Sequence, residues 1–300
     1  MNSTTLGYEV FVADPVPQAL TQPLPNGQPH LYQPIAVTLV HGDHDAVLVD
    51  PPLTGEQAQA VGDWVAASGY RLTHIVSTHG HGDHWFTADV LARRFGAQTL
   101  ATAATIAQMH GSVAARPVVW DVLWPGQIPP SPITAVAPPG NSFGLEGHEL
   151  RLVEVGHTDT DDTSVLHVPD LGLVVAGDVL YNGAHMYVGE SAGGGLDAWR
   201  RAIGTVESLG PRWIVASHMD KSRDNEAARL IAETRGYLDD VEDALATYAT
   251  AEQYFHAMLE RHPDRPYGAT VLWVGAKALY GLRELGGDPV EHVVAAWLSA

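Results

Sequence analysis

The chain has 300 residues, of which 45% are hydrophobic and 17% charged, so it can bury a substantial core and resembles neither a disordered nor a membrane protein in composition. Its 35 acidic and 16 basic residues give a formal net charge of −19, which repels nucleic acid, and the absence of cysteine excludes disulfides, thiolate metal sites and cysteine nucleophiles. No apolar run is long enough to span a bilayer and residues 1–12 lack a signal-peptide pattern, so we expect a cytoplasmic protein that binds neither nucleic acid nor membranes.

Short apolar runs alternate with amphipathic helical stretches from Tyr8 to about Ser217, which is typical of a layered domain of strands and helices. The early strands are predicted to form a hairpin and the late ones a meander, so their pairing is expected to be mixed rather than purely parallel. We predict strands at Tyr8–Val12, Ile35–Val40, Ala46–Asp50, His74–Ser77, Gln98–Ala101, Glu149–Val155, Ser164–Val168, Leu173–Ala176 and Trp213–Ala216, and helices at Gly55–Ser68, Trp85–Phe95, Thr102–His110 and Leu196–Leu209.

Two segments interrupt this alternation. The segment Asp121–Gly147 is rich in proline and glycine and is predicted to be a long surface loop. The stretch Ser222–Ala300 has no convincing strand, and its apolar spacing predicts about three helices. We therefore expect a catalytic domain, residues 1–220, and a C-terminal helical extension, residues 221–300. The apolar surface of the extension would serve as a lid, as a homodimer interface, or as the core of an ordinary helical subdomain.

One loop carries four potential metal ligands within six residues. Between an apolar strand and a helical stretch the chain reads Ser77-Thr78-His79-Gly80-His81-Gly82-Asp83-His84. Imidazole and carboxylate groups suit zinc, iron and manganese, and the two glycines would let the backbone turn tightly enough for the side chains to converge. The pattern H-x-H-x-D-H rarely arises by chance at this composition, so we predict a metal site here.

A single loop cannot complete two metal sites, so further ligands are expected at the ends of other strands. Three candidates each follow an apolar strand after one small residue: His157, Asp178 and His218. Side chains at the carboxyl ends of strands can reach one rim of a sheet sandwich. A second polar cluster, His41-Gly42-Asp43-His44-Asp45, lies between two strands of a predicted hairpin, and we interpret it as a solvated turn.

The order of these motifs resembles the metallo-β-lactamase fold superfamily of metallohydrolases over about residues 8 to 220. The resemblance implies an α+β fold, an αββα sandwich of two mixed sheets flanked by helices, with a dinuclear metal centre. It implies that His79, His81 and His157 hold one metal, that Asp83, His84 and His218 hold the other, and that the Asp178 carboxylate bridges them. Asp50 matches a family position that usually supports the metal loop, although it would equally suit a turn before Pro51-Pro52.

Within the superfamily, the bridging aspartate and the final histidine look like the lactonase and glyoxalase II branches. Tyr181 follows Asp178 by three residues, the spacing at which similar acyl-homoserine lactonases place a tyrosine that contacts the substrate. We therefore predict a hydrolase with two divalent ions, zinc favoured and iron or manganese as alternatives, which uses a metal-bridging hydroxide to cleave a small ester-like substrate, preferably a lactone. Asp83 would pass a proton to the leaving group, and Tyr181 would donate to the oxyanion.

Three other functions remain open on the sequence. A glyoxalase II-like thioester hydrolase is the nearest, although the glutathione-binding cations of that branch have no match, since Lys277 is the only lysine after Lys221. A mononuclear iron persulfide dioxygenase shares much of the ligand set. A non-catalytic metal-binding module is disfavoured because every expected ligand is present.

One departure from the resemblance follows the metal loop. Lactonases and glyoxalases usually have a small or aliphatic residue and then glycine at this point, whereas this chain has Trp85-Phe86. The two rings would either narrow the substrate pocket or pack the helix against the core, and we favour packing.

Overall fold

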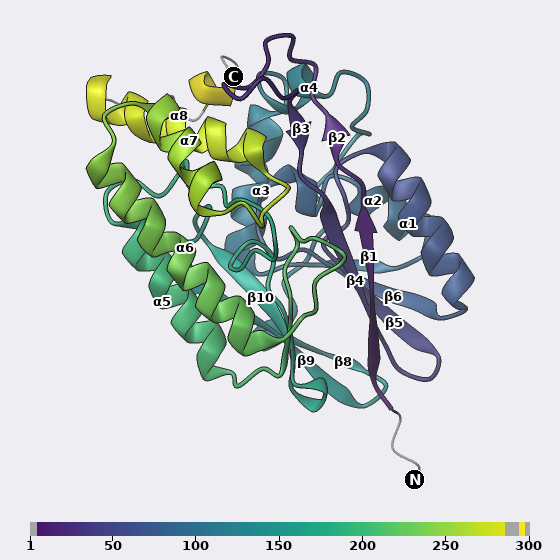
Figure 1. Ribbon diagram of the computed structural model, residues 1–300. Coiled ribbons are helices and arrows are strands. Elements are labelled where there is room, and N and C mark those ends of the chain that lie inside the picture. The colour runs from purple at the N-terminus through teal and green to yellow at the C-terminus, as the bar shows by residue number, and fades with distance from the viewer. Residues whose placement is uncertain (1–4, 286–293, 298–300) are drawn as a thin grey trace.

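The computed structural model describes residues 5–285 and 294–297, and it contains two five-stranded sheets that pack face to face between layers of helices (Figure 1). The first sheet has the order β1-β4-β5-β6-β7, with β1 (Gly7–Ala13), β4 (Ile35–His41), β5 (Asp45–Val49), β6 (Arg71–Val76) and β7 (Gln98–Leu100). The second has the order β12-β11-β10-β9-β8, with β8 (Ser142–Leu145), β9 (His148–Gly156), β10 (Thr163–Val168), β11 (Leu173–Val175) and β12 (Trp213–Val215). This arrangement confirms the predicted αββα sandwich.

Both sheets have mixed pairing, as the sequence predicts. In the first, β1, β4 and β5 pair antiparallel and β6 and β7 continue in parallel. In the second, β8 to β11 pair antiparallel and β12 joins β11 in parallel. A separate two-stranded ribbon of β2 (Val16–Pro17) and β3 (Leu31–Tyr32) leads into β4.

The core between the sheets follows from the alternation of side chains along each strand. Val47 and Val49 of β5 point inward, and they meet Leu150 and Leu152 of β9 in one buried cluster. The opposite face of β5 packs Leu48 against helices α1 (Gly55–Ser68) and α2 (Ala88–Phe95). The centre of the first sheet is therefore buried on both faces, which leaves its strand ends for a site.

The C-terminal helices share one hydrophobic cluster with the outer face of the second sheet. Helices α5 (Gly195–Ser208) and α6 (Ala227–Thr247) lie against this sheet, and α7 (Ala251–Arg261) packs on α6 and on α8 (Ala269–Leu285) beyond its end (Figure 1). Val174 and Ile214 of the sheet belong to the same buried cluster as Leu238, Tyr254 and Leu272 of the helices. The extension thus packs on the sandwich; residues 286–293 and 298–300 of the predicted extension lie outside the described part of the chain. Within that part, no helix combines the length and apolarity that crossing a bilayer requires.

The prediction of a long surface loop at Asp121–Gly147 is wrong in part. It contains the end of α4 (Trp120–Leu123), the 3-10 turn η2 (Pro139–Asn141) and all of β8. Leu123, Trp124 and Ile128 are buried in the cluster that surrounds the metal loop. Proline and glycine mark turns here, but the apolar side chains between them find a surface to pack against, which their local spacing does not reveal. Of the remaining elements, α3 (Ala103–Ala115) extends beyond its prediction, and η1 (Gly82–His84) and η3 (Pro169–Leu171) are single 3-10 turns.

The polar cluster His41–Asp45 forms the β4–β5 hairpin turn, in agreement with its interpretation as a turn. The backbone N–H groups of Asp43, His44 and Asp45 donate to the carboxylate of Glu146 at 3.0, 2.7 and 2.6 Å. These hydrogen bonds lower the pKa of Glu146 from 4.5 to about 2, and the one from the Asp45 N–H has the largest effect. A carboxylate from the β8–β9 turn therefore holds the two sheets together at this end.

This contact predicts a pH-dependent stability. A lowered folded-state pKa means that Glu146 stabilises the fold above about pH 4.5 and loses this contribution as the pH falls toward 2. Glu146→Gln is therefore expected to lower the free energy of unfolding at pH 7, and this difference from the unmodified protein should shrink by about pH 3. Urea unfolding at both pH values measures it, with the exposed Glu56→Gln as control. If Glu146→Gln lowered the free energy of unfolding equally at both pH values, the charge of the Glu146 carboxylate would not be what stabilises this contact.

Candidate metal centre

The predicted ligands lie at the carboxyl ends of strands from both sheets. The loop from Ser77 to His84 follows β6, and its last three residues form η1. His157 follows β9, Asp178 follows β11 and His218 follows β12. Because these strand ends meet at the same edge of the sandwich, loops distant in sequence bring their polar side chains together there.

Six of the seven predicted ligands come together with Asp159 in three groups. Within each group the donor atoms lie within 4.8 Å of one another: His79, His81 and Asp159; His79, His84 and Asp178; Asp83, His84 and His218. Asp159 Oδ2 lies 2.8 Å from His81 Nδ1 and 3.5 Å from His79 Nε2. Asp178 Oδ1 lies 3.5 Å from His84 Nε2, and its Oδ2 lies 3.2 Å from His218 Nε2. Because the group of His79, His84 and Asp178 shares one histidine with each of the other two groups, Asp178 lies beside both of them.

The chemistry of these atoms fits divalent metal ions. Several are buried and have no hydrogen-bond partner: His79 Nε2, His84 Nε2, Asp83 Oδ1 and Oδ2, Asp159 Oδ2 and Asp178 Oδ1. Buried polar atoms without partners cost free energy, so a group of them in one place fits a cation that they would bind together. Imidazole nitrogen and carboxylate oxygen are the donors that zinc, iron and manganese accept.

The orientation of His218 shows which of its nitrogens faces the cluster. Its Nδ1 lies 2.8 Å from the carbonyl oxygen of Pro34, which can only accept, so Nδ1 carries the proton. Its Nε2 then faces the carboxylates of Asp83 and Asp178, at 3.3 and 3.2 Å. A histidine held in this tautomer presents a lone pair to a metal.

Electrostatics support the same conclusion. Burial alone would lower the pKa of the His84 imidazole, but the carboxylates of Asp83, Asp178 and Asp50 raise it well above its ordinary value. Burial likewise opposes the charge on His218, yet Asp178 and Asp83 raise its pKa to about 9. Carboxylates therefore dominate the potential in this buried cluster, which attracts cations.

His157 does not join the three groups, and Asp159 from the same loop does. The Nδ1 atom of His157 lies 2.6 Å from Asp161 Oδ1, and its Nε2 is buried close to Gly195, where an added Cβ would stand 2.8 Å away. Asp159 is fully buried, and the Thr158 hydroxyl donates to its Oδ1 at 2.8 Å, which leaves Oδ2 facing the histidines. The sequence analysis missed Asp159 because a carboxylate two residues after a strand-end histidine carries no distinctive pattern.

Asp50 holds the loop from Ser77 to His84 in place through buried hydrogen bonds. Its carboxylate accepts hydrogen bonds from the Thr78 N–H and hydroxyl, at 2.8 and 2.9 Å, and from the Ser217 hydroxyl at 2.8 Å. Its Oδ2 also lies 3.2 Å from His84 Nδ1. Although burial alone would raise the pKa of Asp50, His84, His79 and the Thr78 N–H lower it. Asp50 therefore links the loops after β6 and β12, which agrees with its predicted supporting position rather than with a simple turn residue.

The two glycines of the metal loop are needed for space rather than for a left-handed backbone. Neither has a positive φ angle. A Cβ on Gly80 would stand 2.5 Å from Gln108 Cβ, and one on Gly82 would overlap the ring of Phe86. Trp85 and Phe86 are buried, and the Trp85 indole N–H donates to the Gly80 carbonyl at 3.0 Å. The two rings thus pack beneath the metal loop, in agreement with the packing interpretation.

Gly82→Ala is expected to destabilise the fold by roughly 1–3 kcal/mol, because the new methyl group must displace a fully buried ring. Thermal or urea unfolding measures the loss. Trimming the ring in Gly82→Ala/Phe86→Leu should recover part of it, whereas Gly236→Ala, whose Cβ meets nothing within 4 Å, serves as the control. No recovery in the double variant would show that the clash is not the cause.

Tyr181 is fully buried, and its hydroxyl donates to Asp178 Oδ2 at 2.6 Å. Its contact with the cluster is therefore through Asp178. Tyr32, which the sequence analysis did not single out, lines the small cavity beside Asp178. Burial, and then the charges of Asp83 and Asp178, raise its pKa well above the ordinary value, so its hydroxyl keeps its proton at neutral pH. No local pattern marks Tyr32, because it reaches the site from the β2–β3 ribbon.

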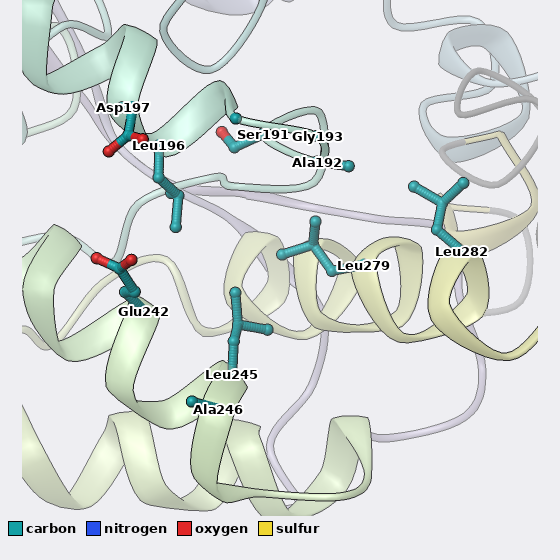
Figure 2. Close-up of a pocket in the computed structure, with 11 residues that line it drawn as sticks. Ser191, Ala192, Gly193, Leu196, Asp197, Glu242, Leu245, Ala246, Leu279 and Leu282 are labelled. Carbon is teal, nitrogen blue, oxygen red and sulfur yellow. The ribbon is translucent and has the colours of Figure 1, made fainter.

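Two connected cavities lead to the cluster. The inner chamber, of about 40 Å³, is lined by Tyr32, His81, Asp159 and Asp178 among others. The outer pocket, of about 520 Å³, extends over α3 and the loop after β9. Another pocket of about 460 Å³ opens between α5, α6 and α8, where Leu196, Leu245 and Leu279 point toward one another (Figure 2). None of the clustered histidines and aspartates lines this third pocket, so the first two cavities define the site.

Comparison with known proteins identifies the family. A family model described as the metallo-beta-lactamase superfamily matches residues 33–218, from just after β3 to His218. The chain belongs to this superfamily. All residues of the three ligand groups lie within the matched range. The chain is therefore a member of a superfamily of metal-dependent hydrolases.

Individual relatives are distant. The chain is 24% identical to a metallo-beta-lactamase type 2 of Bacteroides fragilis over 187 residues, which are 61% of this chain and 68% of that protein. It is 40% identical to a UPF0173 metal-dependent hydrolase of Agrobacterium fabrum over only 70 residues, which are 23% of this chain and 30% of that protein.

Solved structures show the same fold. A metallo-beta-lactamase family protein from Thermus thermophilus superimposes with a TM-score of 0.59 at 19% identity, covering 93% of this chain and 96% of its own. A metallo-beta-lactamase from Pontibacter korlensis gives 0.53 at 18% identity, covering 78% and 99%. At these identities the likeness supports the fold alone. The first match covers so much of the chain that it includes part of the C-terminal helices.

Proposed function

We propose that the protein is a dinuclear metal-dependent hydrolase of small, ester-like carbonyl substrates. The observation that carries the proposal is the convergence of buried imidazole and carboxylate atoms without hydrogen-bond partners at the base of a cavity. A pair of divalent ions, zinc in the first instance, would supply a nucleophilic hydroxide at neutral pH and polarise the substrate carbonyl.

The ligand set follows from the three groups. His79, His81 and Asp159 would hold one ion, and Asp83, His84 and His218 the other. Asp178 would bridge them, since it forms a group within 4.8 Å with His79 of the first set and His84 of the second. This proposal keeps six of the ligands predicted from the sequence and replaces His157 with Asp159.

Two residues are placed for roles beyond binding metal. Asp83 Oδ2 lies 3.3 Å from both His84 Nε2 and His218 Nε2, whereas its Oδ1 is buried without a partner. We assign to Oδ1 the transfer of a proton to the leaving group. The hydroxyl of Tyr32 lines the chamber and keeps its proton, so it would donate to the oxyanion that forms on the carbonyl. Tyr181 would instead position Asp178.

Among ester-like substrates we place lactones first and thioesters second, because the glutathione-binding cations of the thioester-cleaving branch have no match in the C-terminal segment. The test is proton release at constant pH by the zinc-loaded protein with lactones, thioesters, a β-lactam and a phosphodiester, and with metal content measured in parallel. We expect turnover of one ester-like class that Asp178→Ala abolishes. If the protein binds metal but hydrolyses none of these substrates, the proposal is overturned. Oxygen uptake by the iron-loaded protein with a persulfide would instead support the dioxygenase alternative.

A further inference from the structure

The inner chamber and the outer pocket form one substrate path with aromatic walls. The two cavities share four lining residues, His81, Trp120, Glu190 and Trp297. Tyr187 adds a further ring to the chamber, with its centroid 5.9 Å from that of Trp297. A path of this size and lining suits an apolar group of small-molecule size.

Every formal charge that aspartate, glutamate, lysine and arginine side chains contribute to this path is negative. Asp159 and Asp178 line the inner chamber, Asp161 lines the outer pocket, and Glu190 lines both. Glu190 is partly exposed, and its Oε1 lies 3.2 Å from His81 Nε2. No lysine or arginine is among the described residues that line either cavity.

The cation nearest along the chain to the shared wall is committed elsewhere. Arg116 precedes Trp120 by four residues, but its guanidinium donates to the Asp121 carboxylate, to the Ile128 and Pro129 carbonyls and to the Ser131 hydroxyl. These contacts use both terminal nitrogens and Nε. Arg116 is therefore not available to neutralise a negative charge on a substrate.

We infer that the path selects substrates without a negative charge, either neutral or cationic, and discriminates against anionic ones such as carboxylate-bearing β-lactams. The inference rests on the proposed function and specifies its substrate class. Three carboxylate ligands and Glu190 together offset the charge of two divalent ions, so the centre has little net attraction for an anion. Glu190 repels an anionic group at the junction of the cavities, whereas the indole faces of Trp120 and Trp297 favour a cationic or apolar one.

The test uses three 4-nitrophenyl esters of similar acyl length: pentanoate, 4-sulfobutanoate and 4-(trimethylammonio)butanoate. Their kcat/KM values are measured at low salt with the metal-loaded full chain. We expect the anionic ester to react at least about tenfold less efficiently than the neutral one, and the cationic ester to react as well or better. Anionic and neutral esters of equal kcat/KM would overturn the inference.

Variants connect this preference to Glu190. Glu190→Gln should reduce the ratio between cationic and anionic esters at least about threefold, and added salt should reduce it in the unmodified protein as well. Glu56→Gln makes the same charge change on an exposed position of α1 and should leave the ratio unaltered. A ratio that is insensitive to Glu190→Gln would exclude Glu190 as its source.

A binding experiment separates the charge selectivity of the path from the proposed hydrolase function. Phenyltrimethylammonium and benzenesulfonate are titrated into the metal-loaded protein, and the quenching of tryptophan fluorescence is followed. If no ester is hydrolysed but the ammonium binds at least about tenfold more tightly, the proposed function fails and the charge selectivity stands. If esters are hydrolysed and the sulfonate binds as tightly as the ammonium, the charge selectivity fails alone.

Discussion

Asp159→Ala is expected to lower the metal content from about two ions to one per chain and to reduce kcat/KM for the best ester by at least about 100-fold. Asp159 Oδ2 lies 2.8 Å from His81 Nδ1 and 3.5 Å from His79 Nε2, and it accepts no hydrogen bond. Removing it leaves His79 and His81 as the only protein ligands of that ion within their group, which is too few for tight binding.

The variant His157→Ala tests whether Asp159, rather than His157, is the metal ligand. Because the His157 ring is held by Asp161 and lies outside the ligand groups, this variant should keep both ions and most of its activity. Metal analysis after dialysis and the visible spectrum of the cobalt-substituted protein distinguish the two variants without relying on turnover. Asp159→Asn, which preserves shape but removes charge, should resemble Asp159→Ala in metal content. Loss of an ion from His157→Ala together with its retention in Asp159→Ala would reverse the assignment.

Asp50→Ala is expected to reduce the free energy of unfolding by about 3 kcal/mol or more. The substitution leaves the Thr78 N–H and the hydroxyls of Thr78 and Ser217 without their acceptor in a fully buried position. Asp50 also has a φ angle of 56°, which alanine tolerates poorly. Since these donors hold the loops that carry His79 and His218, metal affinity should fall by about 10–100-fold as well.

Urea unfolding and competition with a metal chelator measure these two effects. Asp50→Asn keeps one acceptor oxygen and tolerates the left-handed backbone, so it should lose less stability than Asp50→Ala. Asp43→Ala, an exposed aspartate in the β4–β5 turn, is the matched control and should retain full metal affinity. An Asp50→Ala protein with unchanged metal affinity would mean that this carboxylate stabilises the fold without orienting the ligands.

Much of the metal centre follows from local sequence. The loop from His79 to His84 concentrates four ligands within six residues, so their convergence depends on little more than a strand end and a tight turn. Asp178 and His218 could be predicted because each closely follows a short apolar strand, and the two strands, β11 and β12, pair in parallel and so end at one edge of the sheet. The alternation of apolar runs with helical stretches also predicts a layered domain of strands and helices with mixed pairing, whereas the sandwich itself was implied by the resemblance to the superfamily.

The choice between His157 and Asp159 depends on tertiary contacts. Both follow β9, and local spacing cannot show which side chain turns toward the histidines. In the folded protein the space beside Gly195 of α5 accepts the His157 ring, and Asp161 binds its other nitrogen. The loop then directs Asp159 inward.

The sequence by itself thus predicted a layered fold of strands and helices and most of the residues that the structure brings together in the three groups, because these depend on periodicity and on residues close together in the chain. Only the tertiary structure decided the walls of the substrate path. Tyr32, Glu190 and Trp297 come from the β2–β3 ribbon, the loop before α5 and the C-terminal segment, and they line one cavity. Their proximity arises from the packing of elements more than 100 residues apart, so no local pattern encodes it.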